Sequence, residues 1–218
     1  LRYRADPEWY PTPTPSGGIR APMRLLADGE DLSVLRGKIW VVQVQMLRPV
    51  VPREIKEQAV KAAQMGALAV VMVLTYRTQE LTGRGAHGED GQRAWCPIPV
   101  VGVAGKHDAV VEAARRGATA RLIVRGREEK NAEALNVTGT IGSGTKHIIV
   151  TTPQSGLFRC GGERGGGIAV LLGLAEWAGN RAPNVRYLFS TNTGHEQNGS
   201  GARLLLETLA PPPKDVIA

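Results

Sequence analysis

The sequence has few cysteines, histidines and aromatic residues, and these shortages exclude several classes of protein. Of its 218 residues, 2 are cysteine, 4 are histidine and 5% are aromatic. Two cysteines, Cys96 and Cys160, are too few for a disulfide framework and lack the spacing of a metal site. We expect two independent buried thiols. No apolar run reaches the length of a bilayer-spanning helix, so the sequence predicts no membrane span.

The charge and composition indicate a globular protein that does not bind nucleic acid. The formal net charge is +7, but the arginines are spread along the chain and aromatic residues that could stack on bases are scarce. Hydrophobic residues make up 42% and charged residues 22%, as in ordinary globular domains. We therefore expect no nucleic-acid partner, and the oligomeric state stays open.

The first part of the chain alternates short strands and helices after a proline-rich opening. Residues 1–20 contain four prolines and are predicted to form an extended lead-in. Helices are predicted over 54–65 and 107–116, ended by Gly66 and Gly117 in left-handed caps. Residues 78–94, rich in glycine and arginine, are predicted to form an exposed loop. The expected strands cover 39–44, 68–74, 98–103 and 120–124.

The second part follows the polar run 125–133, a candidate domain boundary, and predicts a strand–helix–strand crossover. Strands are expected at 136–141, 147–152 and 185–190, with a long helix before the last of them. Such a crossover is right-handed and implies a largely parallel sheet. The helix is apolar on one face at Leu171 and on the other at Val170 and Trp177, so we expect it to be covered on more than one side.

Polar residues gather at three places where such a sheet would bind a ligand. The helix is preceded by Cys160-Gly-Gly-Glu163-Arg164-Gly-Gly-Gly, predicted to be a loop whose glycines take positive φ and approach a ligand closely. Residues 151–160 and 191–201 follow two strands, at the edge where α/β sheets bind ligands. The candidates are Ser155, Glu163, His195 and Glu196 as catalytic residues, and Gln154, Cys160, Arg164 and Asn198 as substrate-binding residues.

Two interpretations of these candidates stay open. In the first, His195 acts as a general acid or base beside the carboxylates, and Ser155 or Cys160 attacks the substrate. In the second, Ser155 caps the turn after the strand, Cys160 is packed, and Glu163 pairs with a neighbouring arginine. For Ser155 and Cys160 the second interpretation is favoured. For His195 and Glu196 the first is favoured, because a strand leads directly to that pair.

The order of these segments resembles the M28 family of zinc aminopeptidases. The resemblance rests on Asn136-Val137, Gly142, the strand around Ile148-Ile149-Val150, the glycine-rich start of an apolar helix, and the strand 185–190. Residues 36–125 resemble the protease-associated (PA) domain inserted in that family. The resemblance implies an α/β fold with a mostly parallel sheet flanked by helices, incomplete in this chain, with an inserted PA domain. The implied division is 1–20, a lead-in; 21–130, the PA-like domain; and 131–218, the peptidase-like domain.

The resemblance also implies a degenerate metal site. Pro153 stands where the family has a zinc-binding histidine, and Ser155 where it has an aspartate. Glu163 matches the bridging carboxylate, while His195 and Glu196 match the glutamate pair that supplies a general base and a ligand. Because proline cannot bind zinc, a two-zinc centre is not expected. The alternatives are one zinc held by Glu163 and Glu196, or no metal.

Three functions follow from the resemblance and the candidates together. The first is a peptidase-like hydrolase of peptide or amide bonds with a single-metal or metal-free site. The second is a catalytically inactive relative that serves as a binding protein. The third is a metal-free acid–base enzyme with His195 and a glutamate acting on another small substrate. The PA-like domain slightly favours an extracytoplasmic or secreted location.

Overall fold

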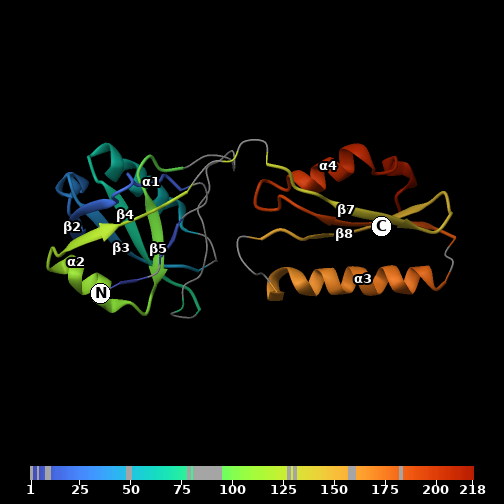
Figure 1. Cartoon of the computed structure of the whole chain (residues 1–218), viewed down its shortest axis with the longest axis horizontal. Helices are drawn as coiled ribbons and strands as arrows, with labels where there is room; N and C mark the ends of the chain where they lie inside the picture. Colours follow the sequence, from blue (N-terminus) through green and yellow to red (C-terminus); the bar gives the residue numbers. More distant parts are fainter. Residues whose placement is uncertain are drawn as a thin grey trace. The chain divides into compact units, whose positions relative to one another are not determined.

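The structure is a computed structural model, and the chain divides into two compact units, Leu1–Glu128 and Glu129–Ala218 (Figure 1). Cys160 and nearly all of the predicted loop 78–94 lie outside the described residues. The described residues are 2–3, 5–7, 11–47, 51–77, 80, 95–126, 129, 132–156, 161–181 and 184–218.

The first unit is built on a six-stranded sheet in the order β1-β5-β4-β3-β2-β6. Its four central strands are parallel, whereas β1 and β6 pair antiparallel at the two edges. The helices of this unit are α1 (Arg53–Gln64) and α2 (Asp108–Arg115), with a short 3₁₀ helix, η1 (Leu32–Leu35). The strands are β1 (Asp6–Pro7), β2 (Ile19–Leu25), β3 (Ile39–Gln45), β4 (Ala69–Thr75), β5 (Val100–Ala104) and β6 (Thr119–Leu122).

Helices cover this sheet on both faces, which explains its apolar strands. Alternate residues of β3 enter two separate cores: Trp40 packs in the core that contains α1, and Val41 in the core that contains α2. A sheet buried on both faces needs continuous apolar strands, and β4 is buried along almost its whole length. The two predicted helices are confirmed to within one residue. Gly66 and Gly117 have φ of 95° and 66°, as expected of left-handed caps.

The described part of residues 1–20 belongs to the first compact unit, whereas we expected an extended lead-in to the peptidase-like domain. β1 pairs with β5, and the main-chain N–H of Thr14 donates to the carbonyl of Val124 at 3.0 Å. The strand β2 was also not predicted. Pro22 in this strand has no N–H to donate to a neighbouring strand. The sheet accommodates it because β2 pairs with β6 up to Pro22 and with β3 from Met23 onward.

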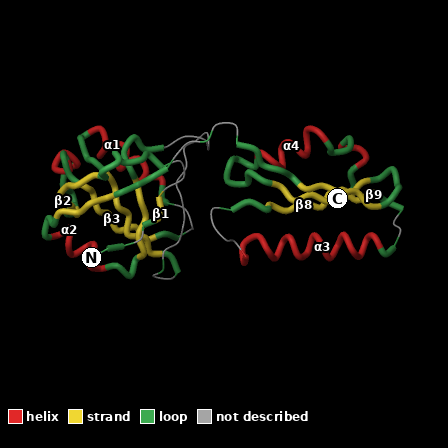
Figure 2. Tube along the Cα trace, in the orientation of Figure 1, coloured by secondary structure: helices red, strands yellow, loops and turns green. Residues whose placement is uncertain are grey.

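The second unit has a three-stranded sheet in the order β7-β9-β8, with α3 on one face and α4 on the other (Figures 1 and 2). β8 and β9 are parallel, as the crossover predicts, but β7 is antiparallel to β9, so the sheet is mixed. Residues 216–218 pair with the other edge of β8. The elements are β7 (Val137–Ile141), β8 (His147–Pro153), η2 (Gly161–Gly165), α3 (Gly166–Gly179), β9 (Arg186–Asn192), α4 (Ser200–Thr208) and η3 (Pro213–Asp215).

Among the described residues of its own unit, helix α3 packs on one side, whereas we expected from the sequence that it would be covered on more than one. Leu171 and Ala178 are buried against Phe189 of the sheet. On the other side, Val170 is 63% and Trp177 45% exposed. The periodicity identified the helix but not its surroundings, because apolar residues on two faces indicate burial only where a neighbour is present. Within the described ranges, no helix is both long and apolar enough to cross a membrane.

Candidate active site

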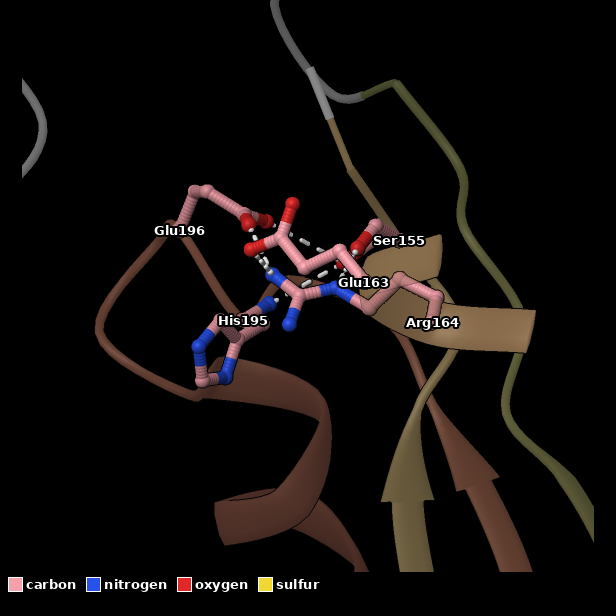
Figure 3. A network of polar contacts seen from close by, with 5 residues as sticks. All are labelled: Ser155, Glu163, Arg164, His195 and Glu196. Atoms are coloured by element: carbon pink, nitrogen blue, oxygen red, sulfur yellow. Dashed lines mark hydrogen bonds and ion pairs between the residues drawn. The ribbon is translucent and has the colours of Figure 1, made fainter. Parts of the chain in front are cut away.

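The candidate site lies at the carboxyl ends of β8 and β9. Because these strands are parallel and adjacent, the residues that follow them meet at one edge of the sheet. Ser155 follows β8, and His195 and Glu196 follow β9. Glu163 and Arg164 come from η2, the single helical turn before α3. Figure 3 shows these five side chains, from three separate segments, gathered at that edge.

Arg164 is the centre of this cluster. Its Nη2 lies 2.5 Å from Glu196 Oε1 and 3.2 Å from Glu163 Oε1. Its Nε donates to the main-chain carbonyl of Ser155 at 2.8 Å. The side chains of Arg164 and Glu196 are 11% and 16% exposed, whereas that of Glu163 is 38% exposed. The two glutamates thus converge on one guanidinium, and Glu196 makes the shorter and more buried contact.

Ser155 joins the two strand ends, but it does not contact the imidazole of His195. Its hydroxyl donates to Glu196 Oε2 at 3.4 Å and accepts from the main-chain N–H of His195 at 3.1 Å. His195 is exposed, and its ring points away from Ser155 (Figure 3). The geometry therefore lacks a Ser–His nucleophile pair. It agrees with the alternative in which Ser155 holds the loop and Glu163 pairs with an arginine.

The glycine-rich segment is helical, which corrects the expectation of a loop with positive φ. Residues 161–165 form one turn of π-helix that continues into α3, and none of the glycines in 161–167 has positive φ. One of them is needed for close packing, since a Cβ on Gly167 would collide with Thr152 Oγ1. A turn wider than the α-helix is a recurrent feature of functional sites. Here it carries Glu163 and Arg164.

A partly buried polar network under the site was missed by sequence reasoning. Asn192, the last residue of β9, accepts from Ser190 Oγ at 2.7 Å and donates to Thr151 Oγ1. Asn136 accepts from the main-chain N–H of Thr193 at 3.0 Å and donates to the carbonyl of Gly201 at 2.8 Å. These contacts fix the loop that carries His195 and Glu196. An asparagine ending a buried strand was the available signal for Asn192.

The remaining candidates are not gathered in the cluster. Gln154 donates to the carbonyl of Leu135 at 2.5 Å and accepts from Thr191 Oγ1 at 2.7 Å, which makes it a link between strand ends. Asn198 is exposed and has a φ of 59° in the turn before α4. Cys160 lies outside the described residues. The substrate-binding roles of these three residues stay predictions.

The described residues do not by themselves make up a zinc centre. Zinc sites use about three N, O or S ligands of the protein. In the described part of the chain, no group of three or more His, Cys, Asp or Glu side chains is placed to hold a metal ion. The two carboxylates that the resemblance assigns to zinc share a cation of the protein itself, Arg164. Pro153, at the expected position of an imidazole ligand, pairs with Asn192 in the sheet.

Solved structures similar to this chain include a zinc aminopeptidase, a second aminopeptidase and an M28 peptidase precursor. BSAP, a zinc aminopeptidase from Bacillus subtilis, aligns with a TM-score of 0.73 at 20% identity, covering 98% of this chain and 51% of that chain. An aminopeptidase from Aneurinibacillus sp. strain AM-1 aligns with a TM-score of 0.62 at 21% identity, covering 100% of this chain and 53% of that chain. A peptidase M28 precursor from Shewanella amazonensis SB2B aligns with a TM-score of 0.64 at 17% identity, covering 95% of this chain and 52% of that chain.

These similarities concern the fold, because the identities are low and the chain spans about half the length of the structures that it matches. No family model and no curated protein matches the sequence. The resemblance drawn from the order of sequence segments is thus supported at the level of the fold. This chain has a mixed α/β fold that resembles about half of each of these aminopeptidase and peptidase structures, and an arginine pairs with both glutamates of its candidate site.

Proposed function

We propose that this chain acts as a peptidase-like hydrolase that cleaves peptide or amide bonds at a remodelled site. One observation carries the proposal: Ser155, Glu163, Arg164 and Glu196 converge from three segments on the ligand-binding edge of a sheet in an aminopeptidase-like fold. Surface ion pairs rarely join three segments at such an edge and leave their arginine only 11% exposed.

In the proposed reaction, Glu196 is the general base. Arg164 holds its Oε1 and Ser155 donates to its Oε2, and we assign Oε2 as the atom that accepts the proton of an attacking water. Glu196 takes a proton from this water as the oxygen adds to the carbonyl carbon of the substrate. The imidazolium form of His195, exposed beside it, protonates the departing amine as the C–N bond breaks; Glu196 then releases its proton to the solvent and His195 takes one up. Glu163, half-exposed, contacts the bound substrate.

The second candidate is a catalytically inactive relative that binds a ligand at this edge. One observation favours it: Arg164 already pairs with both glutamates, so less carboxylate charge is available for proton transfer. In both cases we assign the first unit as a PA-like domain, supported by its α/β sheet and by alignments that span both units. An extracytoplasmic or secreted location is part of this proposal.

Hydrolysis of aminoacyl and dipeptidyl chromogenic amides by the purified full chain distinguishes the two candidates. The hydrolase proposal expects turnover that falls at least about 100-fold in Glu196→Gln, since general acid–base catalysis contributes about 10²- to 10⁴-fold. Glu207→Gln is the matched control, because Glu207 is an exposed glutamate of α4, paired loosely with Arg203 at 4.0 Å. No turnover by the wild type, or equal turnover by Glu196→Gln, contradicts the hydrolase proposal.

A further inference from the structure

We propose that the guanidinium of Arg164 takes the place of a metal ion between Glu163 and Glu196, so that this site is closed to zinc. The inference concerns the same site as the proposed function. It does not depend on turnover, because it is tested by zinc binding. Pro153 replaces the imidazole ligand that the resemblance implies, and Arg164 holds the two carboxylates together in place of a metal ion.

The position of one nitrogen carries the inference. Nη2 of Arg164 contacts a carboxylate oxygen from each glutamate, at 2.5 and 3.2 Å. A zinc ion bound to both carboxylates would lie about 2.0–2.2 Å from its oxygen ligands, in the space that this nitrogen occupies. Zinc and the guanidinium therefore exclude each other. To bind the metal, the protein would have to move Arg164 out of the cluster.

Moving Arg164 is unfavourable because its side chain is held at three points. Besides the two glutamates, its Nε donates to the carbonyl of Ser155 at 2.8 Å, a contact that sets the plane of the guanidinium. The side chain is 11% exposed, so a displaced guanidinium would have to find new partners or water. Removing one partner of a poorly exposed ion pair leaves the other uncompensated, which is costly.

The ligand count limits how tightly this site could hold zinc. Tight zinc sites use about three protein ligands, and in the described residues no third acidic, imidazole or thiol group joins Glu163 and Glu196. The strand that would supply it ends in Pro153, whose ring nitrogen is part of the backbone and has no free lone pair for a metal. The two carboxylates alone would therefore bind zinc weakly, and the cation already present excludes it.

The test measures zinc binding by the EDTA-stripped full chain, with ZnCl₂ alone as the probe and a chromogenic zinc chelator as competitor. The wild type is expected to retain less than about a tenth of a zinc ion per chain after dialysis. Arg164→Lys keeps a cation in the cluster, and its zinc binding is expected to be as weak as that of the wild type. Arg164→Met removes it and is expected to bind zinc at least about tenfold more tightly than the wild type, a gain that Glu196→Gln abolishes in the double variant.

Arg203→Met is the matched control, since it removes an exposed arginine that pairs with a glutamate on α4. Its zinc binding is expected to equal that of the wild type. Stoichiometric zinc in the wild type that is lost in Glu196→Gln overturns the inference and leaves the hydrolase proposal standing. Arg164→Met that binds zinc no more tightly than the wild type also overturns it. If Arg164→Met does not fold, the wild type and Arg164→Lys still decide the outcome. Absence of hydrolysis, in contrast, bears only on the proposed function.

Discussion

The pairing of Arg164 with Glu196 predicts a measurable coupling between the two side chains. Hydrogen bonds to charged groups contribute about 1.5–3 kcal/mol when they are shielded from water. Because the Arg164–Glu196 contact is 2.5 Å long between side chains 11% and 16% exposed, we expect the interaction energy from a double-mutant cycle of Arg164→Met and Glu196→Gln to be about 2 kcal/mol. For Arg164 and Glu163 we expect about 0.5 kcal/mol, since that contact is longer and Glu163 is 38% exposed.

Amide hydrogen exchange of β9 is the suitable assay. The chain has two compact units, so the free energy of opening must be read from the second unit alone, and exchange resolves it by segment. The cycle of Arg203→Met and Glu207→Gln is the control, with an expected coupling near zero because both side chains are more than half exposed. A coupling between Arg164 and Glu196 no larger than this control would refute the ion pair as the organising contact of the site.

Three further predictions concern the surroundings of the site and the first unit. Asn192→Ala leaves Ser190 and Thr151 without their buried partner and should lower the stability of the second unit by about 2–3 kcal/mol, measured by calorimetry; an unchanged transition would contradict the network. Gly201→Ala should cost about 1–3 kcal/mol, because its Cβ would lie 2.9 Å from the main-chain nitrogen of Thr193. Gly173→Ala, also helical but with nothing near its Cβ, should instead stabilise by about 0.5–1 kcal/mol, and equal effects of the two would contradict the packing described. Burial raises the pKa of the Cys96 thiol, and a hydrogen bond from the backbone of Ile98 lowers it by a smaller amount. In a Cys160→Ser background at pH 8, Cys96 should therefore react with Ellman's reagent at least about tenfold more slowly in the folded chain than in urea. Equal rates would show that the thiol is accessible in the folded chain.

The place of the site could be predicted from the sequence because it depends on strand order. Parallel neighbouring strands bring the residues after their carboxyl ends together, whatever those residues are. Ser155 after β8 and Glu196 after β9 therefore meet as expected, 3.4 Å apart through Oγ and Oε2. The helices of the first unit were equally predictable, since glycines with positive φ end them.

The contacts within the site could not be predicted, because they depend on geometry that local patterns do not encode. A run of glycines suits a loop, and nothing in this local pattern indicates that residues 161–165 continue the helix α3 as a helical turn. The pairing of Arg164 with Glu196 joins residues 32 positions apart, and nothing in the spacing distinguishes it from a solvated arginine. Helix α4 was missed too, because its buried face is narrow: Gly201 and Leu205 are buried, whereas the adjacent Leu204 and Leu206 are exposed.

The central claim is that Arg164, rather than a metal ion, lies between Glu163 and Glu196. Diffraction from crystals grown with ZnCl₂, recorded on both sides of the zinc absorption edge, tests it most directly. The account predicts the guanidinium in contact with both carboxylates and no anomalous density between them. A zinc peak bridging the two glutamates, with Arg164 turned away, would contradict it.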